Sequence, residues 1–323
     1  DKRRGRETII PGSPANRLQA YRDTPVEYDA WDIDESFEDQ IWEIDDLVST
    51  RIVETGPYRA AIRFEWRYER STIVQVVALE AGSARLDIDC FIDWHEQDTL
   101  IKAAFPLDLL VRESTAEIQF GHVRRPAHRN TSWDKARFET VMHRWMDLSE
   151  PDFGVAFLND CKYGYDVVGS TVRLTLLKSP TYPWPQADQG EHRFKYALLV
   201  HHGLLDTDVP ALAEAYNLPL RLVPGRATDN QPAVPLVRVE GQGVTLEAVK
   251  QSEAGDAVIM RLWETHGRNG TAVVHLPAGT RQAEIVNLLE RSPEPVAIAN
   301  GAVELALAPF QIVTLRLVMD KRV

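Results

Sequence analysis

The sequence predicts an all-β protein built from two sandwiches, and three observations support this prediction. Apolar and polar residues alternate along several segments, which is typical of strands with one buried face and one solvated face. No segment of about 12 or more residues keeps the 3.6-residue period that would place helices between these strands. A proline-rich stretch separates a longer series of strands from a shorter one.

The longer series contains the clearest alternation. Ala60–Tyr68 and Leu86–Ile92 each place every second apolar side chain on one face, and Thr72–Leu79 between them is more fully apolar. Thr115–Phe120 and Phe153–Leu158 continue the series. Alternation over about ten residues requires one wet and one dry face, which favours antiparallel sheets.

Two later strands each follow a polar loop. Val172–Leu176 and Phe194–Val200 alternate in the same way, and the loops Asn159–Gly169 and Ser179–His192 precede them. Rigid strands that hold out loops rich in polar and aromatic residues are a common way for a β-scaffold to build a polar-ligand site. These two loops are therefore the candidate site.

The chain divides into four parts. Residues 1–26 are polar and proline-bearing and are predicted to be a connector from polypeptide upstream, followed by a large sandwich over residues 27–205. Residues 206–235 are predicted to be a linker, because Ala211–Tyr216 favours one short helix and four prolines follow it.

The small sandwich occupies residues 236–323. Seven short strands separated by turn signals are predicted within it: Leu236–Glu240, Val244–Val249, Val258–Glu264, Ala272–Leu276, Ile285–Leu289, Val303–Leu307 and Ile312–Val318.

Composition excludes several classes of function. The formal net charge of −12 argues against a nucleic-acid or anionic-membrane partner, because both require a basic surface. No apolar run approaches the roughly 18 residues of a membrane span. Two cysteines in 323 residues are too few for a disulfide framework and favour a reducing, cytoplasmic location.

Four motifs in the chain are distinctive. They are LNDCKYGYD at Leu158–Asp166, SPTYPWPQADQGEH at Ser179–His192, AWDID at Ala30–Asp34 and FGHVRRPAHRNTSWDKARFE at Phe120–Glu139. They resemble the C-terminal region of the α-mannosidases of glycoside hydrolase family 38, in its bacterial and cytosolic branch. Matching segments cover nearly the whole chain. The resemblance implies a galactose-mutarotase-like supersandwich followed by a smaller sandwich, in an enzyme that removes terminal α-linked mannose.

The resemblance also implies where the chemistry lies. Family members carry their zinc ligands and their Asp nucleophile in an N-terminal α/β barrel, which these 323 residues do not match. A retaining glycosidase needs two carboxyl groups about 5 Å apart, and nothing in the sequence marks such a pair. We therefore expect no catalytic or metal-binding residue in this chain, and zinc only in the full-length enzyme. The expected partners are an upstream catalytic domain of the same polypeptide and an α-mannoside or oligosaccharide substrate.

In relatives, by the same resemblance, the second loop reaches the active-site side of the catalytic domain. The candidate substrate-pocket residues are Asn159, Asp160, Lys162 and Tyr163 of the first loop and Asp188, Gln189, Glu191 and His192 of the second. Tyr182 and Trp184 offer flat faces on which a sugar could stack. From the residues alone, a tight turn in the first loop and a surface cap in the second explain the same sequence.

Other interpretations stay open. The ten acids and no Lys or Arg between Glu27 and Asp46 fit a solvated face, or a surface at which Trp31, Asp32 and Asp34 pack against the upstream domain. The aromatic loop also fits a non-catalytic carbohydrate-binding module, and a mutarotase-like epimerase is a third class. The sequence does not determine the oligomeric state, and a homo-oligomer is compatible with it.

Overall fold

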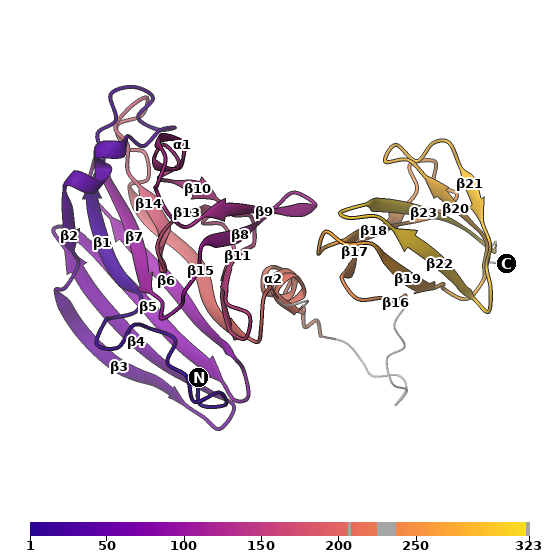
Figure 1. The fold of residues 1–323 in the computed structure, drawn as a ribbon, viewed down its shortest axis with the longest axis horizontal. Coiled ribbons are helices and arrows are strands. Elements are labelled where there is room, and N and C mark those ends of the chain that lie inside the picture. The colour runs from indigo at the N-terminus through magenta and orange to yellow at the C-terminus, as the bar shows by residue number, and fades with distance from the viewer. Residues whose placement is uncertain (206–207, 225–236, 321–323) are drawn as a thin grey trace. The chain divides into compact units, whose positions relative to one another are not determined.

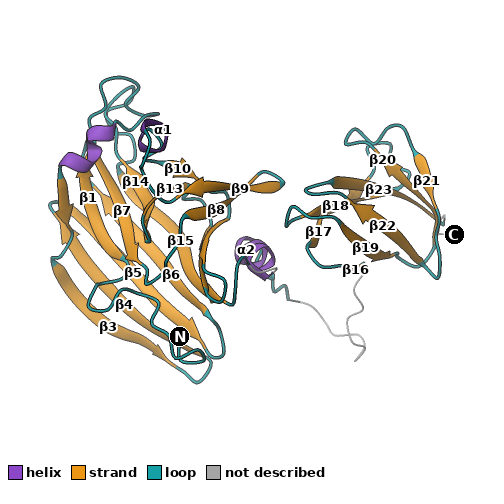
Figure 2. Cartoon of the chain, in the orientation of Figure 1, coloured by secondary structure: helices purple, strands orange, loops and turns teal. Residues whose placement is uncertain are grey.

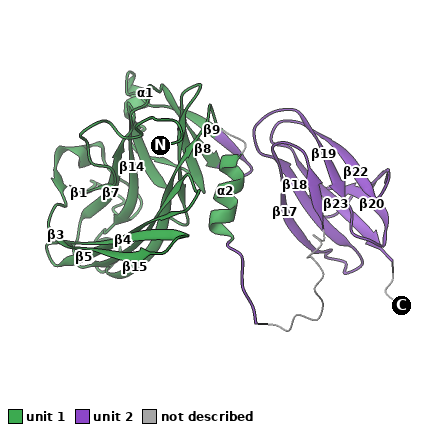
Figure 3. Cartoon of the chain, turned by 90° about the horizontal axis from the view of Figure 1, so that it is seen from below, with its two compact units in different colours: residues 1–117, 123–218 green, residues 118–122, 219–323 purple. Residues whose placement is uncertain are grey.

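The computed structural model describes residues 1–205, 208–224 and 237–320, which form two units made almost entirely of β-strands (Figures 1 and 2). The first unit comprises Asp1–Glu117 and Val123–Leu218, and the second comprises the described residues of Ile118–His122 and Pro219–Val323 (Figure 3). The prediction of an all-β protein with a larger and a smaller sandwich is confirmed.

The first unit consists of two antiparallel sheets. The nine-stranded sheet has the order β3 (Leu47–Thr55), β4 (Arg59–Tyr68), β5 (Ser71–Glu80), β6 (Arg85–Trp94), β15 (Gly190–His201), β12 (Gly154–Asn159), β11 (Trp145–Ser149), β8 (Glu113–Ile118) and β9 (Gly121–Pro126). The six-stranded sheet has the order β10 (Thr140–Val141), β13 (Gly164–Val168), β14 (Thr171–Lys178), β7 (Thr99–Pro106), β1 (Arg17–Arg22) and β2 (Ile41–Glu43).

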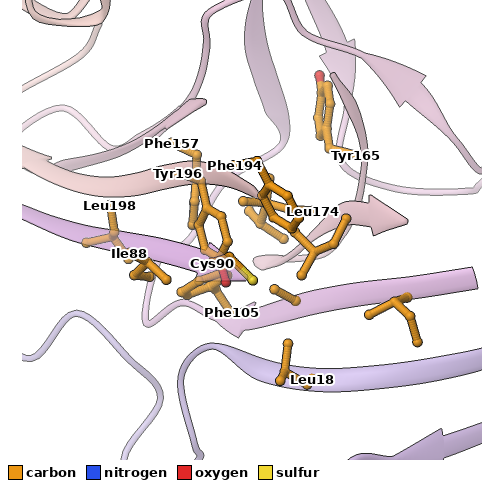
Figure 4. Close-up of a cluster of buried hydrophobic side chains, with 14 of the residues drawn as sticks. Leu18, Ile88, Cys90, Phe105, Phe157, Tyr165, Leu174, Phe194, Tyr196 and Leu198 are labelled. Atoms are coloured by element: carbon orange, nitrogen blue, oxygen red, sulfur yellow. The ribbon is translucent and has the colours of Figure 1, made fainter. Parts of the chain in front are cut away.

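The core of this unit lies between the two sheets. Alternate residues of β6, Ile88, Cys90 and Ile92, are buried, as the sequence predicts. In the centre of the cluster, the ring centroid of Phe105 lies 4.9 Å from that of Phe157 and 6.4 Å from that of Tyr196, in edge-on contacts (Figure 4). Such contacts contribute beyond the apolar area they bury.

Strand β4 departs from its predicted pattern. Ile62, expected on the dry face, is 39% exposed, whereas its neighbour Ala61 is buried. The reason is position: β4 adjoins the edge strand β3, and six strands cannot cover all nine of the opposite sheet. Alternation along one strand carries no information about how far the second sheet extends.

Residues 1–26 are more than a connector. Arg17–Arg22 forms β1, which lies between β7 and β2 and buries Leu18, Ala20 and Tyr21. Just before it, Asn16 belongs to a closed ring of side-chain hydrogen bonds. The Tyr196 hydroxyl donates to Asn16 Oδ1 at 2.6 Å, and Asn16 Nδ2 donates to Gln75 Oε1 at 2.7 Å. Gln75 Nε2 donates back to the Tyr196 hydroxyl at 2.7 Å.

Helices are few and short among the described residues. The predicted short helix is α2 (Asp208–Asn217), whose Val209, Ala213 and Tyr216 pack against β11, β12 and β15 of the first unit. The structure thus places this part of the predicted linker in the large unit. Residues 206–207 and 225–235 of that linker lie outside the described residues. None of the helices in the described ranges has the length and apolarity that crossing a bilayer requires.

The second unit pairs a three-stranded with a five-stranded antiparallel sheet. The orders are β16 (Arg238–Glu240), β19 (Gly270–His275) and β22 (Ala302–Leu307), and β17 (Val244–Gln251), β18 (Val258–Glu264), β23 (Ile312–Met319), β20 (Thr280–Val286) and β21 (Glu294–Val296). The predicted strand Ile285–Leu289 overlaps β20 at Ile285 and Val286 and is wrong beyond them. Strand β20 ends at Val286, and Asn287 Oδ1 accepts the Leu289 N–H at 3.0 Å in a turn that leaves Leu288 and Leu289 exposed.

Candidate functional site

The loop Ser179–His192 is tied to two other segments at one end of the large unit, where Figure 1 shows the indigo and pink loops together. Oδ2 of Asp29 accepts the backbone N–H groups of Thr181 at 2.8 Å and Tyr182 at 3.0 Å. The Thr181 hydroxyl donates to Oδ1 of Asp98 at 3.1 Å. The first half of the loop is therefore held by residues 24–34 and by the turn between β6 and β7.

The second half of the loop is fixed by its own predicted site residues. Gln189 Nε2 donates to the backbone oxygen of Glu96 at 2.5 Å, and His192 Nε2 lies 2.8 Å from the backbone oxygen of Asp188. Asp188 itself adopts a left-handed backbone with φ 56°. Glu191 accepts from Arg193 at 3.3 Å. Gln189 and His192 thus use their side chains to shape the loop.

The side chains of Tyr182 and Trp184 remain exposed on this hydrogen-bonded loop. Their side chains are 67% and 61% exposed, although the backbone of Tyr182 is held by Asp29. Aromatic residues this exposed on a hydrogen-bonded loop are a typical surface for a sugar or for another protein surface.

A buried ion pair lies at the base of these loops. Lys178 Nζ donates to Oδ2 of Asp23, whose side chain is 1% exposed. Burial raises the pKa of Asp23, and the nearby carboxylates of Asp29 and Asp98 act in the same direction, against the lowering effect of Lys178. Lys178 Nζ is also 4.0 Å from Oδ1 of Asp29. One lysine thus compensates much of the negative charge beneath the loops.

The loop that begins at Asn159 is placed differently. Asn159 is buried at the end of β12 and donates through Nδ2 to the backbone oxygen of His143 at 2.8 Å. Oδ1 of Asp160 accepts the Lys195 N–H at 3.1 Å. In the described part of the chain, no hydrogen bond or ion pair joins residues 159–163 to residues 179–192. The structure does not bring the two predicted loops into one bonded site.

The other two predicted site residues of this loop, Lys162 and Tyr163, contact aromatic rings. The Lys162 ammonium lies 4.6 Å from the ring centroid of Phe194, and the exposed ring of Tyr163 meets His143 edge-on at 5.7 Å. Asp160 lines an open groove of about 730 Å³ on the outer face of β4, β5, β6 and β15, together with Phe91, Arg193 and Lys195.

A second groove, of about 600 Å³, lies beside the Ser179–His192 loop. It is lined by Thr24, Pro25, Val26, Glu27, Tyr28, Asp29, Asp98, Thr181 and Tyr182. Sequence reasoning included Tyr182 but missed Tyr28, Glu27 and Asp98. The acidic run after Glu27 was a signal for this surface, but it could not show which loop lies opposite.

A buried charge network supports the same end of the unit and was not predicted. Lys102 is fully buried, and its ammonium contacts Glu139 and, at 2.7 Å, Oδ2 of Asp166. Burial lowers the pKa of Lys102, but the two carboxylates outweigh it and raise the pKa above its ordinary value. Burial raises the pKa of Glu139. Lys102 and Asp166 are buried, Glu139 is largely so, and Lys102 pairs with both carboxylates, which disfavours their use as the two carboxyl groups of a glycosidase.

The network continues to the segments that carry the exposed loops. Arg173 links Asp166 to Glu38 at 2.7 Å each, and Arg129 contacts the same Glu38 carboxylate. Glu38 lies in the short 3-10 helix η1 (Glu35–Asp39) that covers the outer face of the six-stranded sheet. This chain of ion pairs therefore fixes the part of the acidic segment that contains Glu38.

A zinc centre needs three or four His, Cys, Asp or Glu ligands around one point. Across residues 1–205, 208–224 and 237–320, no group of three or more His, Cys, Asp or Glu side chains is arranged to hold a metal ion. His201 instead pairs with the buried Asp147, at 2.7 Å. The described residues therefore do not fit a zinc centre, and we derive no chemical step through one.

Two family profiles match the sequence. The profile described as the glycosyl hydrolases family 38 C-terminal domain matches residues 1–186, and the family 38 C-terminal beta sandwich domain matches residues 243–315. The human protein Alpha-mannosidase 2C1 is 37% identical over 98% of this chain. An Alpha-mannosidase of Saccharomyces cerevisiae is 28% identical over 94% of the chain. The chain spans about a third of these relatives, 31% of each.

Solved structures agree on the fold. The crystal structure of an alpha-mannosidase from Enterococcus faecalis V583 superimposes with a TM-score of 0.78 at 19% identity. The match covers 94% of this chain and 38% of that protein. At this identity the likeness supports the arrangement of the strands and does not by itself support an activity.

Proposed function

Because the chain belongs to glycoside hydrolase family 38, we propose that it is the C-terminal, non-catalytic part of an α-mannosidase. The whole enzyme would hydrolyse terminal α-linked mannose with retention of configuration and with zinc. The curated relatives support this proposal, since they are named alpha-mannosidases and extend well beyond the region this chain covers.

The loop cluster is the observation that carries the proposed role. Asp29, Asp98 and Gln189 fix the Ser179–His192 loop by hydrogen bonds, while Tyr182 and Trp184 stay exposed. Because the loop is already ordered, little conformational entropy is lost when it forms one wall of a pocket. We propose that this end of the large sandwich faces the catalytic domain and helps to bound its sugar pocket.

The individual predicted residues have different roles in this proposal. Tyr182, Trp184, Asp188 and Glu191 are the groups able to reach substrate, whereas Gln189 and His192 position the loop. Asn159, Asp160, Lys162 and Tyr163 would contribute from a separate surface, because no hydrogen bond or ion pair in the described residues joins them to the Ser179–His192 loop.

A substitution in the full-length enzyme tests the role of the loop. Tyr182→Ala is expected to lower kcat/KM for an aryl α-mannoside by about tenfold, which corresponds to 1.4 kcal/mol of lost transition-state stabilisation. Tyr58→Ala is the matched control, because Tyr58 is 83% exposed in the turn between β3 and β4. Equal kcat/KM values for the two variants would refute the pocket role.

The proposal also includes a cytoplasmic location. Cys90 and Cys161 are both free thiols, and Cys90 is buried in the core. Unpaired thiols persist in reducing compartments, where glutathione and thioredoxin keep them reduced.

A further inference from the structure

The groove of about 600 Å³ beside the Ser179–His192 loop has features that the pocket role does not use. Its two walls come from residues 24–29 and residues 181–182, and Asp98 forms part of the lining. The walls are joined by Asp29, which accepts two backbone N–H groups from the opposite wall. The groove therefore has a fixed width within this chain.

Tyr28 is held in an uncommon conformation on one wall. Its φ is 56°, in the left-handed region that bulky side chains rarely occupy. The backbone oxygen of Tyr28 accepts the N–H groups of Trp31 at 2.7 Å and Asp32 at 2.9 Å, and these bonds maintain the turn. The ring is nonetheless 66% exposed. Strained residues of this kind are frequent at ligand sites.

The groove thus offers two aromatic rings, those of Tyr28 and Tyr182, and polar groups beside them. Glu27 is exposed and has no hydrogen bond or ion pair within the described residues. The hydroxyls of Thr24 and Thr181 are further neutral polar groups of the lining. Aromatic faces next to hydrogen-bond acceptors match a pyranose, which has apolar C–H faces and a rim of hydroxyl donors.

The charges of the groove favour a neutral ligand over a cationic one. Asp29 and Asp98 accept hydrogen bonds from the loop, and Lys178 and Arg22 lie 4.0 Å and 3.5 Å from their carboxylates. This leaves Glu27 as the carboxylate of the groove that lacks a partner within the described residues. Binding of a basic peptide would require more unpaired carboxylates than this single glutamate.

We propose that this groove is a carbohydrate subsite in its own right, which binds a neutral hexopyranose unit of an α-mannoside between Tyr28 and Tyr182. Glu27 accepts hydrogen bonds from the sugar hydroxyls. The choice of an α-mannoside rests on the proposed function. The site lies wholly within this chain and requires no catalytic domain.

The test is a calorimetric and NMR titration of the 323-residue chain with methyl α-D-mannopyranoside and with an α-linked mannobiose. Glycerol serves as the non-sugar control. Saturable binding is expected for the sugars and not for glycerol. Tyr28→Asn removes the ring while keeping a residue that tolerates the left-handed backbone, and is expected to weaken binding at least fivefold. Glu27→Gln is expected to weaken it about threefold.

Tyr58→Asn is the matched control and should bind as the unmodified chain does, with the unfolding temperature of every variant measured in parallel. Absence of saturable sugar binding overturns the subsite, as does binding that Tyr28→Asn and Glu27→Gln leave unchanged. Binding of a lysine-rich peptide without binding of sugar also overturns it. None of these outcomes affects the mannosidase proposal, which is tested by turnover in the longer enzyme.

Discussion

Oδ2 of Asp29 lies 3.0 Å from the backbone nitrogen of Tyr182, and this bond joins residues 153 positions apart in the sequence. It fixes an exposed aromatic side chain through its backbone and leaves the ring free. The same carboxylate also holds Thr181. The position of the aromatic loop therefore depends on one residue of the acidic segment near the N-terminus.

Asp29→Ala is expected to loosen the Ser179–His192 loop. Loss of two charge-assisted hydrogen bonds should cost about 1–3 kcal/mol locally, so backbone amides of residues 181–189 should exchange with deuterium faster. Asp39→Ala is the control, because Asp39 is exposed and has no partner in the described residues. Unchanged exchange in the loop of Asp29→Ala would show that the loop is held by other contacts.

The sandwiches were predictable from the sequence because strand alternation is local. Ile88, Cys90 and Ile92 are buried in the register that their spacing predicts, and so are Val172, Leu174 and Leu176. Strand β1 was missed because RLQAYR is short and polar, and its burial depends on β7 and β2, which lie far away in the sequence.

The candidate site was predictable only in part. The Ser179–His192 loop was identified from its composition, but its partner segment was not, because the bond from Asp29 to Tyr182 is a tertiary contact. For the same reason the sequence could not show that Gln189 anchors the loop to Glu96, or that Asn159 is buried. The contact of His192 with Asp188 spans only four residues, but composition alone does not show that the imidazole turns back onto the loop backbone.

Lys102→Met is expected to destabilise the large unit strongly. It removes the cation of Glu139 and leaves Asp166 with Arg173 alone, and the loss of one partner of a buried ion pair costs about 3–5 kcal/mol in comparable cases. The double variant Lys102→Met with Glu139→Gln should recover part of this loss. Lys135→Met, at an exposed ion pair with Glu35, should change the free energy of unfolding by less than about 0.5 kcal/mol. Denaturant unfolding followed by fluorescence measures all three, and equal stabilities for the two single variants would contradict the account.

Glu38 predicts a pH dependence of stability. Burial raises its pKa, but hydrogen bonds from Arg129 and Arg173 outweigh burial, so the pKa lies below the ordinary value of 4.5. A carboxyl with a lowered pKa in the folded state stabilises the fold above its unfolded pKa. That contribution is lost as the pH falls through the folded pKa. Below about pH 4.5 the unfolding temperature should fall more steeply for the unmodified chain than for Glu38→Gln. Parallel curves for the two proteins would exclude this role of Glu38.

The reactivity of the two thiols tests the burial of Cys90 and the exposure of Cys161. Burial raises the pKa of Cys90 to about 12, whereas Cys161 is exposed, with a pKa raised to about 11 by partial burial and by Asp160. A thiol reagent at pH 8 should therefore modify Cys161 slowly and leave Cys90 unmodified until denaturant is added. Cys161→Ser should show no modification in the native state, and rapid native labelling of that variant would contradict the burial of Cys90.

The most direct test of the central claim is turnover of an aryl α-mannoside with added zinc. It compares the purified 323-residue chain with the same chain extended to the full length of its open reading frame. The account predicts turnover by the extended protein alone, because no group of three or more His, Cys, Asp or Glu side chains among the described residues is arranged to hold a metal ion, and the curated relatives extend well beyond the region that this chain covers. Turnover by the 323-residue chain itself, with contaminating mannosidase excluded, would contradict the account and place a complete active site within these residues.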